Sequence, residues 1–142
     1  MIYILKNIGI DIKTKIVKIE NKLIKLNISD IKSLERIKVI NKNYIKGCHG
    51  IIFIYDITNK NSFSYIKQMI KHTKYNICKA LVGNNCDLSN RVVTENEGKK
   101  LANDFKISFF EVSTRTKQNI KEVFNSLIRE MIKNAENNIK KN

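Results

Sequence analysis

Hydrophobic and polar residues alternate with a period of two in the first part of the chain. The alternation runs through Ile10–Ile19 and again through Asn21–Ile28, with the polar residues Glu20, Asn21 and Lys22 at the junction. Because successive side chains of a strand point to opposite faces, this period predicts two half-buried strands. The junction is short and polar, so the two strands are predicted to pair as an antiparallel hairpin.

Later segments predict strands that alternate with helices. Gly50–Tyr55 is a continuous apolar run, which is typical of a strand buried on both faces of a sheet. The apolar start of Ala80–Asp87 and the segment Ile107–Val112 are predicted as the two following strands. Strands that alternate with helices indicate an α/β fold, with a mostly parallel sheet, helices on both faces and the hairpin at one edge.

The predicted helices are marked by capping residues and by apolar stripes. Asn61 and Ser62 are placed to cap one helix, Thr94 and Glu97 form a capping box before the next, and Lys38–Lys46 is predicted as a further helix. The stripes of the two capped helices consist of Phe63, Ile66, Met69 and Ile70, and of Leu101, Ala102 and Phe105. The most regular stripe belongs to the last helix and consists of Ile120, Val123, Phe124, Leu127, Ile128, Met131, Ile132 and Ala135. Stripes at this spacing indicate helices that pack on a core.

Length and composition fit one domain and narrow the class of protein. The 142 residues contain no proline, no low-complexity linker and no internal repeat, so residues 1–142 are interpreted as a single domain. The net charge of +14 comes from 27 Lys and Arg against 13 Asp and Glu, and most of the basic residues are scattered lysines. This distribution argues against a specific nucleic-acid interface and predicts at most a weak attraction to anionic membranes.

The cysteines and histidines do not have the spacing of metal ligands. Cys48, Cys78 and Cys86 are odd in number and far apart, and neither His49 nor His72 has a Cys or His neighbour at ligand spacing. The thiols are interpreted as reduced residues of a cytoplasmic protein, and no metal site is predicted.

The candidate chemistry lies in Ala80–Asp87, where an apolar strand runs into a turn that carries an amide and a carboxylate. Gly83 allows the backbone to approach a flat ligand closely. The Asp87 carboxylate can accept two hydrogen bonds from adjacent donors on a guanine edge, and the Asn84 amide can join neighbouring loops or bond the ring. An ordinary polar turn uses the same residue types, so the surrounding segments decide between the two interpretations.

Several segments occur in the order and at the spacing of the Rab family of Ras-superfamily small GTPases. Leu81–Leu88 resembles the guanine-specificity motif Asn-Lys-x-Asp, and Glu111–Arg115 resembles the Glu-Thr-Ser-Ala-Lys loop. Ile52–Thr58, followed by Ser62 and Phe63, is similar to the fourth strand and the start of the next helix, and Ile8–Ile12 to the start of the second strand. Collinear blocks over nearly the whole chain are far more specific than one motif. The resemblance implies an incomplete P-loop NTPase fold of the Ras-like kind.

The resemblance assigns guanine-nucleotide binding to two loops. The residues concerned are Asn84, Asn85, Asp87, Ser113, Thr114 and Arg115. Asn85 stands where the family has a lysine whose aliphatic stem covers one face of the guanine ring, and a short amide covers less of it. The expected binding of GTP or GDP is therefore weak or absent.

The switch regions depart from the family at positions that serve the phosphates, Mg²⁺ and water. Ser33 stands in place of a glycine near the terminal phosphate, and Leu34 in place of the glutamine that orients the attacking water. Asn7 stands in place of a threonine that closes on Mg²⁺ and the terminal phosphate. Asp30 is retained and corresponds at most to a water-mediated Mg²⁺ contact. Hydrolysis is therefore expected to be lost, with no catalytic residue assigned and Mg²⁺ binding not expected.

The strand, Gly-rich phosphate loop and helix with which the family begins are not found in these residues. Without the backbone N–H groups and the lysine of that loop, the phosphates have no cradle. Met1–Leu5 is apolar, β-prone and too short for a signal peptide or a membrane span, and it is expected to take the central place of the missing strand. The missing helix is expected to leave an apolar patch, so self-association is predicted.

The partner and membrane surfaces of the family are also reduced. Its exposed aromatic triad corresponds to Ile12, Ser29 and Tyr44, so one ring remains and ordinary effectors are expected to bind poorly. Ile139–Asn142 lacks the cysteines that carry prenyl groups in Rab proteins, so no stable lipid anchor is expected.

The sequence thus predicts a Rab-like protein of vesicle trafficking that retains part of the guanine site and has lost GTP hydrolysis. Its expected partners are proteins of the Rab trafficking machinery, and its expected location is the cytoplasm, peripheral to intracellular membranes. One alternative is that these residues are an N-terminally truncated form of a GTP-binding Rab. The other is a basic module that binds acidic surfaces.

Overall fold

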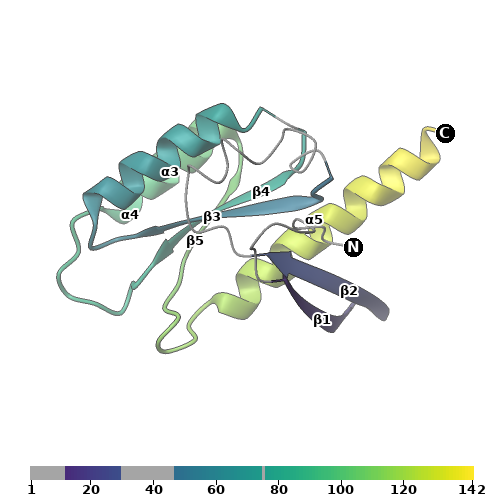
Figure 1. Ribbon diagram of the computed structural model, residues 1–142, viewed down its shortest axis with the longest axis horizontal. Coiled ribbons are helices and arrows are strands. Elements are labelled where there is room, and N and C mark those ends of the chain that lie inside the picture. Colours follow the sequence, from purple (N-terminus) through teal and green to yellow (C-terminus); the bar gives the residue numbers. More distant parts are fainter. Residues whose placement is uncertain (1–11, 30–46, 75) are drawn as a thin grey trace. The chain divides into compact units, whose positions relative to one another are not determined.

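A computed structural model describes residues 12–29, 47–74 and 76–142. Its elements are, in chain order, β1 (Ile12–Ile19), β2 (Lys22–Ser29), β3 (Gly50–Asp56), α3 (Lys60–His72), β4 (Cys78–Asn84), α4 (Glu95–Phe105), β5 (Ser108–Glu111) and α5 (Ile120–Lys140) (Figure 1). The described residues form two compact units. The first unit contains the β1–β2 hairpin, residues 47–51 and 76–78, and α5 from Ile128 onward. The second unit contains residues 52–74 and 79–127.

The predicted hairpin is confirmed. β1 and β2 pair antiparallel with Ile19 opposite Lys22. Between them, Glu20 and Asn21 have φ values of 48° and 65°. Two successive positive φ values are typical of a type I′ turn, whose twist matches that of paired strands. One face of the hairpin carries the buried Ile19 and Leu26, as the period-two pattern requires.

The three-stranded sheet has the order β3-β4-β5. β4 and β5 are parallel neighbours, in register from Ala80 opposite Ser108 to Gly83 opposite Glu111. The predicted α/β class, with a parallel sheet and an antiparallel hairpin, is therefore confirmed. The expected strand at Met1–Leu5 and the expected helix at Lys38–Lys46 lie outside the described residues.

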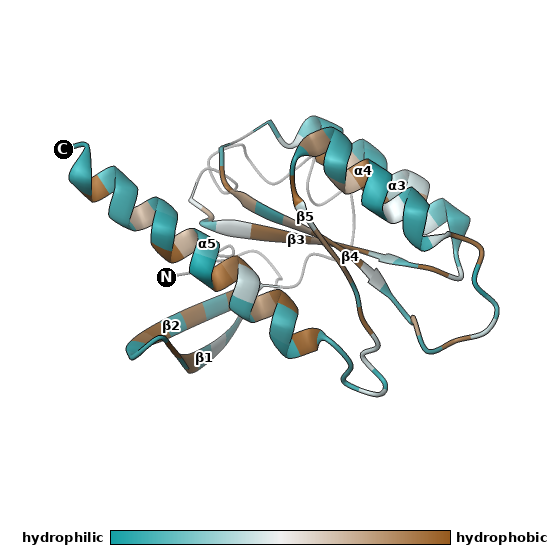
Figure 2. Cartoon of the chain, turned by 180° about the vertical axis from the view of Figure 1, so that it is seen from behind, coloured by the Kyte–Doolittle hydropathy of each residue, from teal (hydrophilic) through white to brown (hydrophobic). Residues whose placement is uncertain are grey.

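Both faces of the three-stranded sheet carry buried side chains, and Figure 2 shows predominantly hydrophobic residues along its strands. On one face, Val82 and Val112 pack against Val123 near the start of α5. The partly buried side chains around this cluster are Ile52, Phe110 and Ile120. The other face carries Tyr55, whose ring meets the Phe63 ring of α3 edge to face at a centroid distance of 4.9 Å. Helices thus cover both faces, as the sequence predicts.

The Tyr55 ring lies so close to Gly83 and Gly98 that neither position has room for a Cβ atom. Its side chain is almost fully buried, and its hydroxyl has no hydrogen-bond partner among the residues that the structure describes. A Cβ at Gly83 would lie 2.9 Å from the Tyr55 hydroxyl oxygen, and one at Gly98 would lie 2.5 Å from it. The added atom at Gly98 would also lie 2.5 Å from the Phe109 ring. Burial, and then the negative charge of Glu111, raises the pKa of the Tyr55 hydroxyl well above its ordinary value.

The cap of α3 differs from the prediction. The helix begins at Lys60, and its capping residue is Asn59 rather than Asn61 or Ser62. The Asn59 side chain accepts the N–H of Ser62 at 3.1 Å, while the Ser62 hydroxyl accepts the N–H of Asp56 at 2.9 Å. The Asn59 side chain lies three residues before Ser62, whose backbone N–H has no partner within the helix, so Asn59 can cap this N–H. The helix therefore begins nearer the N-terminus than predicted.

The capping box of α4 is confirmed. The Thr94 hydroxyl accepts the N–H of Glu97 at 3.1 Å, and the Glu97 carboxylate accepts the N–H of Thr94 at 2.8 Å. Leu101 and Ala102 are buried as predicted, but Phe105 is exposed. Phe105 is the last residue of the helix, beyond its last buried residue, Ala102.

Two further burial predictions are wrong. Ile54 is 55% exposed although β3 was expected to be buried on both faces. Its neighbours Phe53 and Tyr55 occupy the buried face, and the alternation of the strand turns Ile54 to the other side. In α5, Val123, Leu127, Ile128 and Met131 of the predicted stripe are buried and Phe124 is half-buried, but Ala135 lies in the exposed final turns of the helix.

We predict that Gly98→Ala lowers the free energy of unfolding by about 1–2 kcal/mol, because the overpacking against Phe109 and Tyr55 outweighs the better helix propensity of alanine. Urea denaturation of the purified protein measures this. Asn103→Ala, at an exposed position of the same helix, is the control and should be neutral or slightly stabilising. A Gly98→Ala protein as stable as the control would contradict the close packing.

Candidate functional site

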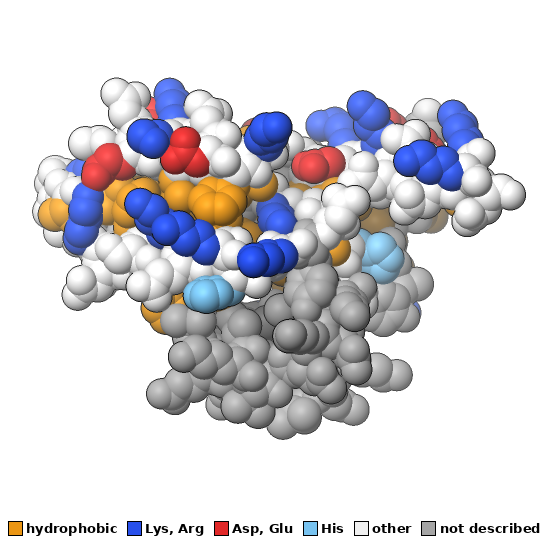
Figure 3. Space-filling model, turned by 90° about the horizontal axis from the view of Figure 1, so that it is seen from above, with side chains coloured by type: hydrophobic (Ala, Val, Ile, Leu, Met, Phe, Trp, Pro, Cys, Tyr) orange, Lys and Arg blue, Asp and Glu red, His pale blue; other side chains and the backbone are white. Residues whose placement is uncertain are grey.

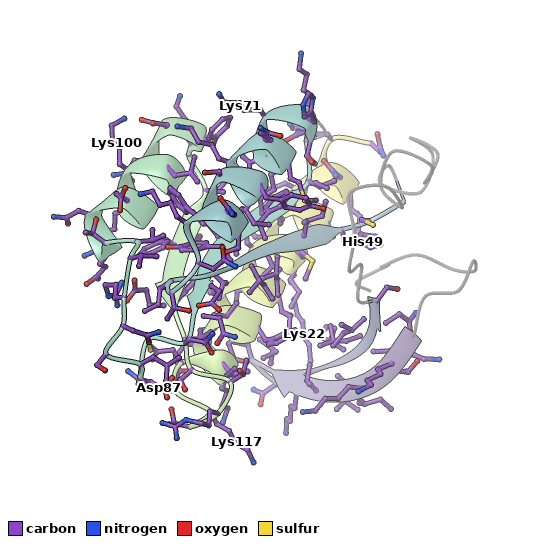
Figure 4. The ribbon with its side chains drawn as sticks, turned by 60° about the vertical axis from the view of Figure 1, so that its left-hand side comes forward. Lys22, His49, Lys71, Asp87, Lys100 and Lys117 are labelled. Atoms are coloured by element: carbon purple, nitrogen blue, oxygen red, sulfur yellow. The ribbon has the colours of Figure 1, made fainter. Side chains whose placement is uncertain are left out.

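The candidate site lies where two parallel strands end in the second unit. Because β4 and β5 are paired in register, their carboxyl ends meet at the same edge of the sheet. Asn84 is the last residue of β4, the turn after it carries Asn85 and Asp87, and the loop after β5 contains Ser113 and Thr114. Figure 4 shows Asp87 and Lys117, from the two loops, at the same end of the sheet. The structure thus brings together residues that are about thirty positions apart in sequence.

Asn84 joins the two loops with both ends of its amide. Its Nδ2 donates to the Thr114 hydroxyl at 3.3 Å, and its Oδ1 accepts the backbone N–H of Thr114 at 3.1 Å. Backbone bonds continue this connection, because Val112 N–H donates to Gly83 O at 2.8 Å and Cys86 N–H donates to Val112 O at 3.0 Å. The position of each loop therefore depends on the other.

Asn85 has a left-handed backbone conformation, with φ of 69°. An asparagine tolerates this conformation better than most residues, which fits a sharp turn at the end of a strand. Burial is the largest single influence on the pKa of Asp56 and raises it, but hydrogen bonds from Thr58 and then from the Asn85 side chain together lower this pKa below its ordinary value. Asn85 is therefore directed toward the end of β3.

Asp87 carries the charge of the site. One oxygen, Oδ2, accepts hydrogen bonds from Arg115 Nε at 2.9 Å and from Arg115 Nη2 at 2.7 Å. The other oxygen, Oδ1, is buried and accepts no hydrogen bond of ordinary geometry in the described residues. The Asp87 side chain is 12% exposed, whereas that of Arg115 is 74% exposed. Hence the carboxylate is fixed in the protein, and its ionic partner extends into solvent.

The pKa of the Asp87 carboxyl is lowered, first by the nearby Ser113 hydroxyl and then by Arg115. A lowered pKa means that the carboxylate stays charged below the range in which an ordinary aspartate titrates. The stabilisation that depends on this charge is complete above the ordinary pKa and is lost as the pH falls through the lowered value. The Asp87 carboxylate is therefore charged at neutral pH.

The loop after β5 is held by internal bonds. Ser113 is fully buried, its hydroxyl accepts the N–H of Thr116 at 3.1 Å, and its own N–H donates to Gln118 O at 3.2 Å. Asn119, with φ of 60°, donates its side-chain amide to Glu111 O at 2.9 Å. These contacts return the chain to α5 and keep the loop closed.

Sequence reasoning missed an ion pair that supports the site. Arg91 Nη1 and Nη2 lie 2.7 Å and 2.8 Å from the two carboxylate oxygens of Glu111, and Nη1 also donates to Val93 O at 3.0 Å. Glu111 is the last residue of β5, directly before the site loop. The two residues are twenty positions apart on different elements, so no local spacing pointed to the pair.

The other predicted site residues are not part of this cluster. Ile12 and Ser29 are opposite one another in the hairpin, which belongs to the first unit, and Ser29 is only 8% exposed. Ser29 therefore offers little surface to a partner. The remaining positions lie outside the described residues and are Asn7, Asp30, Ser33, Leu34 and Tyr44.

The described residues contain neither a three-residue cluster of metal ligands nor a membrane-spanning helix. No group of three His, Cys, Asp or Glu side chains among them is arranged to hold a metal ion. In the same part of the chain, no helix combines the length and the apolar character needed to cross a bilayer.

Comparison with known proteins gives a consistent result. The family model of the Ras family matches residues 3–133. The chain is 39% identical over 131 residues to Ras-related protein Rab-1 of Theileria parva, an alignment that covers 88% of this chain and 60% of that protein. It is 41% identical over 133 residues to Ras-related protein Rab-13 of Mesocricetus auratus, covering 90% of this chain and 66% of the relative. The chain thus spans less than two thirds of the length of these relatives.

We predict that Arg91→Met lowers the free energy of unfolding by about 1–3 kcal/mol, because it leaves the largely buried Glu111 carboxylate without its partner. Urea denaturation at neutral pH measures the change. Arg129→Met is the matched control, since it removes the same side chain from an exposed pair with Glu20 and should cost at most about 1 kcal/mol. Equal losses of unfolding free energy in the two variants would contradict the prediction that the Arg91–Glu111 pair stabilises the protein more than an exposed pair does.

Proposed function

This chain belongs to the Ras family, and we propose that it is a Rab-like protein that recognises the guanine base but does not hydrolyse GTP. The observation that carries the proposal is the pair of reciprocal hydrogen bonds between Asn84 and Thr114. These bonds hold the Asp87 turn and the Ser113–Arg115 loop as the two walls of one small site.

Base recognition follows from the chemistry of Asp87. Guanine presents two adjacent N–H donors on one edge, and a carboxylate can accept both of them. The largely buried position of Asp87 keeps the orientation of this acceptor fixed, which is the condition for selectivity. Asn85 gives less cover to the ring than the lysine at this position of the resembled motif. Selectivity for guanine with low affinity is therefore the expected behaviour.

The loss of hydrolysis follows from the residues at the resembled switch. Leu34 has neither a donor nor an acceptor to orient an attacking water, and Ser33 restricts the backbone where the resembled motif has glycine. These 142 residues also contain no Gly-x-x-x-x-Gly-Lys segment that would hold the phosphates. GTP, GDP and Mg²⁺ are accordingly not expected to bind tightly to this chain.

The similarity to Rab proteins supports a role in vesicle trafficking through contacts with proteins of the Rab machinery, near intracellular membranes. The charge of +14 adds a weak attraction to anionic lipid. On the face shown in Figure 3, the Lys and Arg side chains are dispersed among neutral and acidic ones rather than gathered in one stripe. This dispersal favours the Rab-like role over a dedicated basic module.

A second candidate is that the chain is part of a GTP-binding Rab. The observation that favours it is the coverage of 60–66% of the relatives' length. In that case, the phosphate site would be supplied by residues that are not in the present sequence. Leu34 in place of glutamine and Ser33 in place of glycine predict weak hydrolysis under this alternative as well.

We predict that guanosine and GDP bind these 142 residues weakly, with similar affinities and without a requirement for Mg²⁺, and that ADP does not bind. Isothermal titration calorimetry measures this. Asp87→Ala should reduce guanosine affinity at least about tenfold, because it removes a charged acceptor. Asp104→Ala, which removes an exposed carboxylate of α4, is the control and should have no effect. Submicromolar, Mg²⁺-dependent binding of GDP would refute the proposal.

We also predict that the purified chain hydrolyses no GTP above background, because Leu34 cannot position water and no phosphate-loop lysine stabilises the developing charge. Phosphate release under single-turnover conditions measures this. A turnover that disappears in Asp87→Ala but persists in Asp104→Ala would establish activity at this site and overturn the prediction.

A further inference from the structure

The acceptor that a guanine base needs is already engaged within the protein. Both hydrogen bonds from Arg115 go to the same oxygen, Oδ2 of Asp87, at 2.9 Å from Nε and 2.7 Å from Nη2. The second oxygen, Oδ1, is buried. The oxygen of the carboxylate that is open to a ligand is therefore the one that the guanidinium group covers.

A base that donates to this carboxylate must reach Oδ2, because Oδ1 is buried. Oδ2 has limited lone-pair capacity beyond the two N–H groups that it already accepts, and the guanidinium fills the space in front of it. Guanine and the Arg115 side chain therefore compete for the same place on Asp87. The hydrogen bonds from guanine and those from Arg115 are both charge-assisted, because the acceptor is an ionised carboxylate, and the guanidinium adds its own charge, so the two partners compete measurably.

The two partners of this ion pair are not equally free to move. Asp87 is 12% exposed, and its turn is tied to the neighbouring loop through Asn84. Arg115 is 74% exposed, and its side chain has several rotatable bonds. Opening the site therefore requires a rotation of the Arg115 side chain and no rearrangement of the backbone.

We propose that Arg115 determines the guanine affinity of this site, by competing with the base for Asp87 Oδ2. The inference rests on the proposed function, since it concerns the same guanine site. It assigns Arg115 a role opposite to that of a binding residue. Removal of its guanidinium group strengthens recognition of the base.

The test compares Arg115→Met with the unchanged protein and with Arg129→Met. Methionine keeps much of the aliphatic bulk of the side chain and removes every donor. Arg129→Met removes the same charge from another exposed ion pair, with Glu20, in the other unit. Guanosine is the probe because it has no phosphate, so the loss of a positive charge has no direct effect on the affinity.

We expect Arg115→Met to bind guanosine about two- to fivefold more tightly than the unchanged protein, the range that corresponds to an exposed ion pair. Arg129→Met should bind like the unchanged protein. High salt should strengthen guanosine binding to the unchanged protein, because screening weakens the ion pair, and should have no such effect on Arg115→Met. In an NMR titration, Arg115→Met should also raise the pKa of the Asp87 carboxyl.

The outcomes separate the two proposals. Equal guanosine affinity and an equal response to salt in the two proteins would overturn the role of Arg115 and leave the proposed function intact. Weaker binding by Arg115→Met would also overturn it, since Arg115 would then hold the base. No guanosine binding by either protein would overturn the proposed function and the role of Arg115 together. An unchanged Asp87 pKa in Arg115→Met would overturn the ion pair itself, whatever guanosine does.

Discussion

The parallel pairing of β4 and β5 is the constraint on which the candidate site depends. Four paired positions, from Ala80–Ser108 to Gly83–Glu111, set the relative height of the two strands. A shift of one residue would turn the side chains of one strand to the opposite face and move Asn84 away from Thr114. Val82 and Val112, which pack against Val123 on one face, add buried apolar contact to this register.

Around this register, the site combines rigid and adjustable parts. The turn after β4 and the loop after β5 are joined by backbone and amide hydrogen bonds, and Arg91 anchors Glu111 directly before the loop. The Arg115 side chain, in contrast, extends into solvent while it engages the largely buried Asp87. Such a division lets one side chain respond to a ligand while the recognition groups keep their geometry.

Much of the fold could be predicted because its signals are local. The period of two specifies the hairpin, the Thr94–Glu97 box specifies the start of α4, and the stripe from Val123 to Met131 specifies α5. The cap of α3 was misplaced because Asn59, Asn61 and Ser62 are all good capping residues, and only the helix path selects Asn59. The exposure of Ile54 could not be predicted, because it depends on what covers one face of the strand at that position.

The site shows the same division between local and non-local information. Asn84 and Asp87 could be selected from their motif, but the Arg115–Asp87 and Arg91–Glu111 ion pairs join residues that are distant in sequence. Opposite charges are common on a chain of this composition, so charge alone does not identify partners.

The packing around Tyr55 has an evolutionary consequence. Gly83 and Gly98 both approach the hydroxyl end of this ring so closely that neither position has room for a Cβ. The three positions belong to different elements, yet a change at one alters what the other two can accept. In a lineage descended from this protein, positions 55, 83 and 98 should therefore covary, and a smaller ring or side chain at position 55 should come before any replacement of the glycines.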